Sequence, residues 1–191
     1  MRILALLGSP RPDGNTRAVL DGVLEGARQA GAETELIELS ALKDLSGCVE
    51  CFTCQQTPDA PGCAIDDDMQ EVLAKALTAE VLVLATPVFC WSMSWLLKAA
   101  LDRFYCMFKF GDEEARCLLE GRGLAGVITA GGGENDGADG VTETFGRLAQ
   151  FSKCRWLGTF IAANATTPEE LRADQDLRSG AQEFGQSLVS Q

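Results

Sequence analysis

The sequence predicts a doubly wound α/β fold in which five parallel strands form one sheet with helices on both faces. Five apolar, strand-like runs are spaced along the chain, and each is followed by a segment with helical character. Three of these runs are almost unbroken in hydrophobic residues, as strands buried on both faces of a parallel sheet are. Strict alternation of the two element types favours a parallel sheet wound in both directions.

The elements follow in order, with residues 2–7 and 15–30 as the first strand and helix. Ala18, Val19, Val23 and Ala27 form the apolar stripe of that helix, and a glycine at 31 ends it. The last helix begins with a capping threonine followed by proline and two acids. The remaining strands are expected at 34–39, 80–85, 123–129 and 156–162, and the remaining helices at 67–79, 91–106, 140–153 and 168–188.

Composition and charge limit the classes of protein to which this chain can belong. The 191 residues are 46% hydrophobic and 23% charged, which predicts one globular domain over 1–191. A formal net charge of −12 argues against nucleic acid or an anionic membrane as a partner. The chain has no histidine, which excludes Ser-His-Asp and Cys-His catalysis. The first apolar run is too short for a membrane span and lacks the features of a signal peptide, so we expect a cytoplasmic protein.

Two long connections, 40–66 and 130–140, are where function is expected, and their tips should converge beyond the carboxyl ends of the strands. A third segment, 8–16, joins a buried strand to a helix N-terminus that can bind an anion. It matches neither a Walker A loop nor the dinucleotide Gly-x-Gly-x-x-Gly pattern. From residue chemistry alone, this segment is either a phosphate loop or an ordinary capped turn.

The stretch "GSPRPDGNTRAVL" closely resembles the opening of the NADPH-dependent FMN reductase family, whose members have a flavodoxin-like fold. The resemblance implies that the phosphate of FMN is bound by Ser9, Arg11, Asn15 and Thr16. Two further segments, "ATPVFCWSMSWLLKAALDRFY" and "ITAGGGENDGAD", are similar to the family's other flavin loops. They imply ring-binding residues at Thr86, Pro87, Val88, Phe89, Cys90, Trp91, Ala130, Gly131 and Gly132.

The residue types agree with that assignment. Val88, Phe89 and Trp91 offer apolar surface for a flavin, and glycines at 131–133 keep side chains away from the ring. Core or oligomer packing is the alternative reading of these aromatic residues, and for Trp95 it is the preferred one. Lys98 and Asp102 are spaced as a helical ion pair. The apolar stretch 89–110 predicts a homodimer or homotetramer.

The cysteine-rich loop at 46–66 contains Cys48, Cys51, Cys54 and Cys63. The Cys-x₂-Cys-x₂-Cys run is the local pattern with which bacterial ferredoxins bind a [4Fe–4S] cluster, and Cys63 is the candidate fourth ligand. A zinc site, a Cys51–Cys54 disulfide or free thiols remain alternatives. The loop also resembles the iron–sulfur flavoprotein branch of the family, although its last spacing is longer than expected there. The cysteines at 90, 106, 117 and 154 are expected to pack or to be incidental.

These observations predict an FMN-dependent electron-transfer oxidoreductase, with a [4Fe–4S] cluster at 48–63 passing electrons to or from FMN. The donor would be a reduced nicotinamide, NAD(P)H, or a ferredoxin-like protein, and the acceptor a small molecule or a protein. One alternative is a cluster-free NAD(P)H-dependent FMN or quinone reductase. A second alternative, of a different class, is a non-enzymatic flavin carrier or metal-binding regulatory module. No side chain is assigned a catalytic role of its own.

Overall fold

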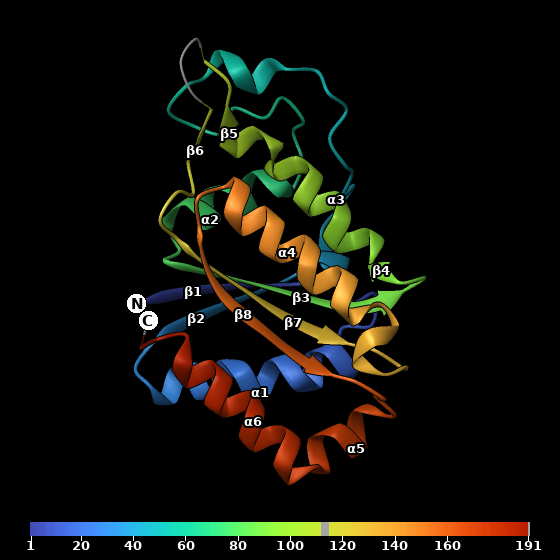
Figure 1. Ribbon diagram of the computed structural model, residues 1–191. Helices are drawn as coiled ribbons and strands as arrows, with labels where there is room; N and C mark the ends of the chain where they lie inside the picture. Colours follow the sequence, from blue (N-terminus) through green and yellow to red (C-terminus); the bar gives the residue numbers. More distant parts are fainter. Residues whose placement is uncertain (112–114, 191) are drawn as a thin grey trace.

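The computed structural model describes residues 1–111 and 115–190, which are built around one parallel sheet (Figure 1). The strand order is β2-β1-β3-β7-β8, and all four pairings along this path are parallel. This is the 2-1-3-4-5 order of flavodoxin-like folds, so the predicted fold class is confirmed. The strands are β1 Arg2–Leu7, β2 Glu33–Glu38, β3 Val81–Phe89, β7 Gly123–Thr129 and β8 Arg155–Ala162.

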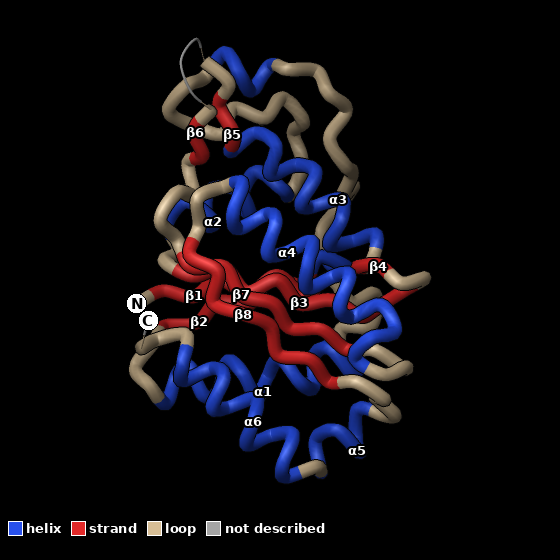
Figure 2. Tube along the Cα trace, in the orientation of Figure 1, coloured by secondary structure: helices blue, strands red, loops and turns tan. Residues whose placement is uncertain are grey.

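Helices cover both faces of the sheet (Figure 2). One face carries α1 (Asn15–Gln29), α5 (Pro168–Ala173) and α6 (Gln175–Ser187). The opposite face carries α2 (Met69–Thr78), α3 (Trp95–Arg103) and α4 (Asp139–Phe151). Each face has its own buried apolar cluster, because the strands are buried on both sides.

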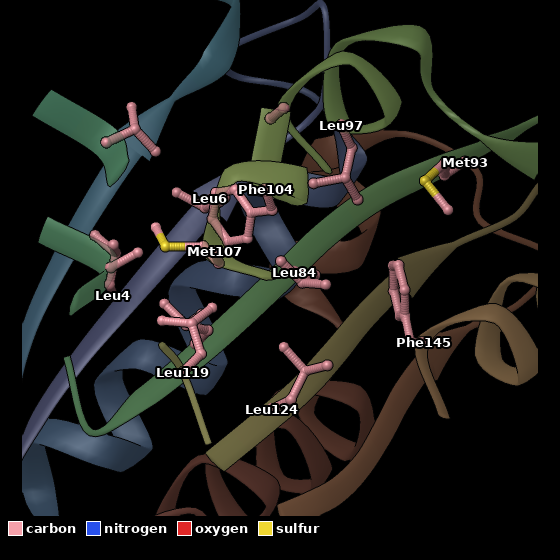
Figure 3. Close-up of a cluster of buried hydrophobic side chains, with 14 of the residues drawn as sticks. Leu4, Leu6, Leu84, Met93, Leu97, Phe104, Met107, Leu119, Leu124 and Phe145 are labelled. Atoms are coloured by element: carbon pink, nitrogen blue, oxygen red, sulfur yellow. The ribbon is translucent and has the colours of Figure 1, made fainter. Parts of the chain in front are cut away.

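The cluster under α2, α3 and α4 is the larger one, and Figure 3 shows part of it around Leu84 and Phe104. Leu97 in the first turn of α3 and Phe104, which directly follows its last residue, belong to this cluster together with strand residues such as Leu6 and Leu84. This packing fixes α3 firmly, and the segments at its two ends carry the candidate sites.

Several boundaries differ from the sequence prediction. The strand predicted to end at residue 85 continues to Phe89, and the helix predicted from 91 begins at Trp95. The residues between them form a hairpin with β4 (Ser92–Met93). The helix predicted over 168–188 is broken at Asp174, whose side chain accepts a hydrogen bond from the amide of Leu177 and so begins α6.

Short elements complete the chain. β5 (Phe108–Lys109) and β6 (Arg116–Cys117) pair antiparallel, apart from the main sheet. Irregular helical turns cover η1 Leu39–Ala41, η2 Thr53–Gln56, η3 Phe104–Met107 and η4 Glu134–Ala138. Such elements are too short to have a detectable hydrophobic period. Across the described residues, no helix is long and apolar enough to cross a bilayer.

Candidate functional site

The first candidate site is a cavity of about 320 Å³ at the carboxyl ends of β3 and β7. Such a volume lies at the lower end of the range for small-molecule sites. Two loops enclose it, the β3–β4 hairpin and the glycine-rich segment after β7. Its lining residues are Val88, Cys90, Trp91, Ala130, Gly131, Gly132 and Asp136.

Six of these seven residues were predicted from the sequence, and Asp136 was missed. The prediction also included Thr86, Pro87 and Phe89, which do not line the cavity. Thr86 is fully buried, and its hydroxyl accepts a hydrogen bond from the amide of Ser94 at 2.9 Å. It therefore holds the hairpin onto α3. Phe89 is exposed on the hairpin, because alternate strand residues point to opposite sides.

Backbone strain is concentrated at the tip of the hairpin. Phe89 pairs with Ser92, so Cys90 and Trp91 form a two-residue turn, and their φ angles are +47° and +59°. A turn with two positive φ angles is of type I′ and strongly favours Asn-Gly. Cysteine and tryptophan are costly there, which marks the turn as a site where side-chain identity is kept at the expense of stability.

One hydrogen bond joins the two loops around the cavity. The indole Nε1 of Trp91 donates to a carboxylate oxygen of Asp136 at 2.8 Å. Gly137 has a φ of +101° and lies against Trp91, so that a Cβ atom there would approach the tryptophan backbone to 2.9 Å. Only glycine allows the two loops to approach this closely.

The candidate anion-binding end of the site is the N-terminus of α1. Gly14 caps the helix without a side-chain hydrogen bond, and its first turn contains no acid. The first turn therefore presents free backbone N–H groups and the positive end of the helix dipole. This arrangement suits a phosphate.

The predicted phosphate ligands have different environments. Ser9 is buried and its hydroxyl bridges the backbone of Arg11, while the Arg11 side chain is exposed. The hydroxyl of Thr16 is buried in a 2.7 Å hydrogen bond with that of Thr129, which joins α1 to the end of β7. The amide nitrogen of Asn15 donates to the carbonyl of Thr166, and among the described residues its oxygen is buried without a partner. A hydroxyl group of a bound cofactor would satisfy that oxygen.

The second candidate site is the cysteine loop, where Cys48, Cys51, Cys54 and Cys63 line one cavity (about 20 Å³). Three of the sulfur atoms accept an N–H hydrogen bond at 3.3–3.4 Å, from Glu50, Gln55 and Arg103. The fourth, that of Cys51, accepts one from the backbone of Thr53, which is the main cause of its lowered pKa. Hydrogen bonds of this kind stabilise thiolates and tune the potentials of iron–sulfur clusters.

The loop tolerates this convergence because several residues adopt left-handed backbone conformations. Glu50 and Phe52, the residues on either side of Cys51, have φ angles of +54° and +57°. Gly62 has a φ of +63° where the chain turns back towards Cys63. The eight residues between Cys54 and Cys63 thereby fold back, and Cys63 reaches the cavity that the other three cysteines line.

In the described residues, no three or more Cys, Asp or Glu side chains are close enough to hold a single metal ion. The four corners of an iron–sulfur cubane each take a different thiolate, so its ligands stand further apart than those of one ion. The cavity itself holds about one water molecule, so a cluster would require the exposed Cys51 side of the loop to move outward.

Arg103 anchors this loop and was not predicted to do so. Its side chain is fully buried and forms a bidentate ion pair with Asp67, with N–O distances of 2.6 and 2.9 Å. It also donates to Cys63 Sγ and to the carbonyls of Ser46 and Ile65. Burial alone lowers the pKa of Arg103, but the hydrogen bonds that the guanidinium donates to Asp67 and Cys63 outweigh it, and the pKa is raised.

The remaining cysteines differ in their surroundings. Cys106 lies at the edge of the same cavity, and burial raises its pKa to about 12. Cys117 is buried, with a pKa raised to about 11 for the same reason, and Cys154 is half-buried. Cys90 is exposed at the first cavity, between the β3–β4 hairpin and the segment after β7, and does not pack. Lys98 and Asp102 form the expected ion pair at 2.6 Å.

The two candidate sites do not converge within one chain, contrary to the expectation for the loop tips. The first cavity is lined by the hairpin that precedes α3, whereas the cysteine cavity is lined by Arg103, Tyr105 and Cys106 at the far end of α3. β4 and β5 accordingly lie at opposite ends of α3 (Figure 1). A helix of this length spans roughly 13 Å. The cysteine loop is drawn away because Arg103 and Lys109 bind its carbonyls.

Comparison with known proteins places this geometry in a family. Residues 1–167 match the family described as NADPH-dependent FMN reductase. The chain belongs to that family. The predicted resemblance is thus confirmed over most of the sequence.

Curated relatives support the predicted branch. An iron–sulfur flavoprotein of Methanocaldococcus jannaschii is 37% identical over 103 residues, 54% of this chain and 51% of that protein. One from Archaeoglobus fulgidus is 31% identical over 135 residues, 70% of this chain and 57% of that protein. The matched region spans only about half the length of these relatives.

Solved structures agree in fold. An FMN-dependent NADH-azoreductase from Bacillus anthracis, in complex with FMN, has a TM-score of 0.72 at 16% identity. The superposition covers 99% of this chain and 100% of the azoreductase chain. An NAD(P)H:quinone oxidoreductase from Methanothermobacter marburgensis has a TM-score of 0.70 at 18% identity, covering 97% and 95%. At such identities the likeness establishes the fold alone.

Proposed function

We propose that this protein is an FMN-dependent, NAD(P)H-dependent oxidoreductase of the FMN reductase type. One observation carries the proposal, namely an apolar, glycine-lined cavity beside an uncapped helix N-terminus at the carboxyl edge of the sheet. Membership of the NADPH-dependent FMN reductase family supports the same cofactor. When bound, FMN supplies hydride and electron transfer, which the protein's own side chains cannot perform.

The residues present fit FMN. The backbone of 14–17 and the guanidinium of Arg11 would hold the phosphate. Trp91 and Val88 would pack against one side of the ring, while Gly131 and Gly132 would admit it close to the backbone. The Trp91–Asp136 hydrogen bond would hold the indole in place beside the ring. The other predicted flavin contacts at 86, 87 and 89 would act only by shaping the hairpin.

We further propose that Cys48, Cys51, Cys54 and Cys63 are the ligands of a [4Fe–4S] cluster, which supplies one-electron transfer when bound. Their shared cavity, and the N–H hydrogen bond to each sulfur, support this assignment. The iron–sulfur flavoproteins among the relatives support it as well. Because the two sites lie at opposite ends of α3, the flavin facing the cysteine loop would be that of a neighbouring subunit.

The phosphate site can be tested with Asn15→Asp, which places an acid in the first turn of α1. Repulsion of the phosphate should lower the affinity for FMN about tenfold, since helix-terminal charge effects are on the order of 1 kcal/mol. Titration with riboflavin is the control, because riboflavin lacks the phosphate and its affinity should not change. An equal loss for both ligands would refute phosphate binding at this helix.

The cluster can be tested by measuring iron, acid-labile sulfide and FMN in protein purified without air. About four iron and four sulfide per FMN are expected. Flavin without iron after anaerobic reconstitution would leave the cluster-free NAD(P)H-dependent FMN or quinone reductase as the function. Flavin that neither a reduced nicotinamide nor a ferredoxin-like donor reduces, and that passes no electrons to a quinone, would instead indicate a flavin carrier.

A further inference from the structure

Two buried cations approach the cysteine loop from the same segment of the chain. Arg103 ends α3, and Lys109 lies six residues later in β5. Their residues are 1% and 5% exposed, which is rare for basic side chains. Together they bind backbone carbonyls at both ends and in the middle of the loop.

The two cations differ in how their charge is balanced. Arg103 is neutralised by the buried carboxylate of Asp67. Lys109 Nζ donates instead to two carbonyls, those of Cys54 at 2.8 Å and Pro61 at 3.1 Å. Within the described residues Lys109 forms no ion pair. The carboxylate whose charge acts on Lys109 is that of Asp59, which is exposed. A buried charge without a counter-charge is costly, so a fold that keeps one needs an anion nearby.

The anion-forming groups close to Lys109 are thiols. Cys54 is buried, and its own carbonyl is the acceptor at 2.8 Å. Cys106 lies at the edge of the same cavity. Cysteine ligands of iron are thiolates, so a loaded cavity carries negative charge that the Asp67-paired Arg103 does not offset.

We propose that Lys109 is the positioning and charge-compensating residue of the cysteine cavity. It holds the 54–61 part of the loop through the two carbonyls, and its charge offsets that of the iron-bound thiolates. The second of these roles depends on the proposed cluster, whereas the first does not. A cation beside a redox centre stabilises the more negative, reduced state, so Lys109 raises the reduction potential of the cluster.

Two neutral variants separate the roles. Lys109→Gln removes the charge but keeps an N–H donor one bond nearer the backbone, whereas Lys109→Met removes both. Both should shift the midpoint potential of the cluster to more negative values, measured by redox titration followed by electron paramagnetic resonance. Both should also lose iron to a chelator about tenfold faster than the unaltered protein, as outer-shell changes typically do. Arg178→Gln, a loss of one exposed charge in α6 on the opposite face of the sheet, is the matched control and should change neither quantity.

The holding role is tested in cluster-free protein by amide hydrogen exchange. Lys109→Met should increase exchange in 54–62 about tenfold, while Lys109→Gln should increase it less. Unchanged exchange in Lys109→Met would overturn the holding role, whether or not a cluster forms. An unshifted potential in both variants would overturn the charge role. If the unaltered protein takes up no iron, the proposed cluster and the charge role both fail, and the exchange result alone decides the holding role.

Discussion

At the scale of single residues, Arg103 is the side chain on which the cysteine loop depends most. It is the largest fully buried side chain among the described residues, and it forms hydrogen bonds with four residues of 46–67. The sequence offers no sign of this. The spacing of charges on the helix predicts only the Lys98–Asp102 surface pair and gives Arg103 no partner. Burial of Arg103 follows only from the docking of the loop onto the end of α3.

Replacing Arg103 by methionine should lower the free energy of unfolding of the cluster-free protein by about 3–5 kcal/mol, because Asp67 would be left buried and unpaired. Urea denaturation measures the change. Arg103→Lys should recover little of it, since an ammonium cannot form the bidentate pair. The double variant Arg103→Met with Asp67→Leu should recover part of the lost stability. A decrease in the free energy of unfolding below about 1 kcal/mol for Arg103→Met would show that the pair contributes little.

Cys106 gives the cluster-free protein a pH dependence. Its folded pKa of about 12 lies above the value of 9.0 for an unhindered thiol. The unfolded chain therefore loses this proton first, and the free energy of unfolding should fall as pH rises from about 9 towards 12. The slope from this thiol is at most about 1.4 kcal/mol per pH unit. Cys106→Ala should flatten the slope of stability against pH, whatever its effect at pH 7, and an unchanged slope would contradict the burial effect.

At the scale of elements, the β3–β4 hairpin shows what sequence periodicity misses. The apolar stretch that begins at Phe89 suggests a helix from 91, yet Cys90 and Trp91 turn the chain and α3 begins four residues later. Ser94 explains the new start, because its hydroxyl accepts from the amide of Leu97 and donates to the carbonyl of Gly8. The second of these bonds ties the hairpin to the phosphate loop, a contact between distant parts of the chain.

Substituting Asn-Gly for Cys90-Trp91 should relieve the strain of the turn. The free energy of unfolding of FMN-free protein should rise by about 1 kcal/mol, after allowance for the lost Trp91–Asp136 bond. FMN affinity should fall, because the ring loses an apolar contact. Denaturant unfolding and flavin fluorescence measure the two effects. A variant that is less stable than the original would show that the turn is not strained.

At the scale of the whole molecule, exposed aromatic side chains remain to be explained. Trp91 and Trp95 are 72% and 62% exposed, so the core packing considered for Trp95 is wrong, and oligomer packing stays a prediction. If Trp95 lies between subunits, Trp95→Glu should convert the oligomer to monomers without loss of the folded state. Sedimentation velocity measures the mass, with Trp156→Glu, at a less exposed aromatic residue, as the control. An unchanged mass would place the interface elsewhere.

The sequence by itself determined the layered α/β fold, and its family resemblance singled out the two loops that border the first cavity. The fold follows from local signals, namely buried strand runs that alternate with amphipathic helical segments. The tertiary structure alone decided that Thr86 and Phe89 stand outside the cavity, that Asp136 stands within it, and that Arg103 and Lys109 hold the cysteine loop. Those facts depend on contacts between residues tens of positions apart, such as Lys109 with Cys54 or Trp91 with Asp136. Periodicity carries no record of such contacts, because packing of α3 on the sheet sets them.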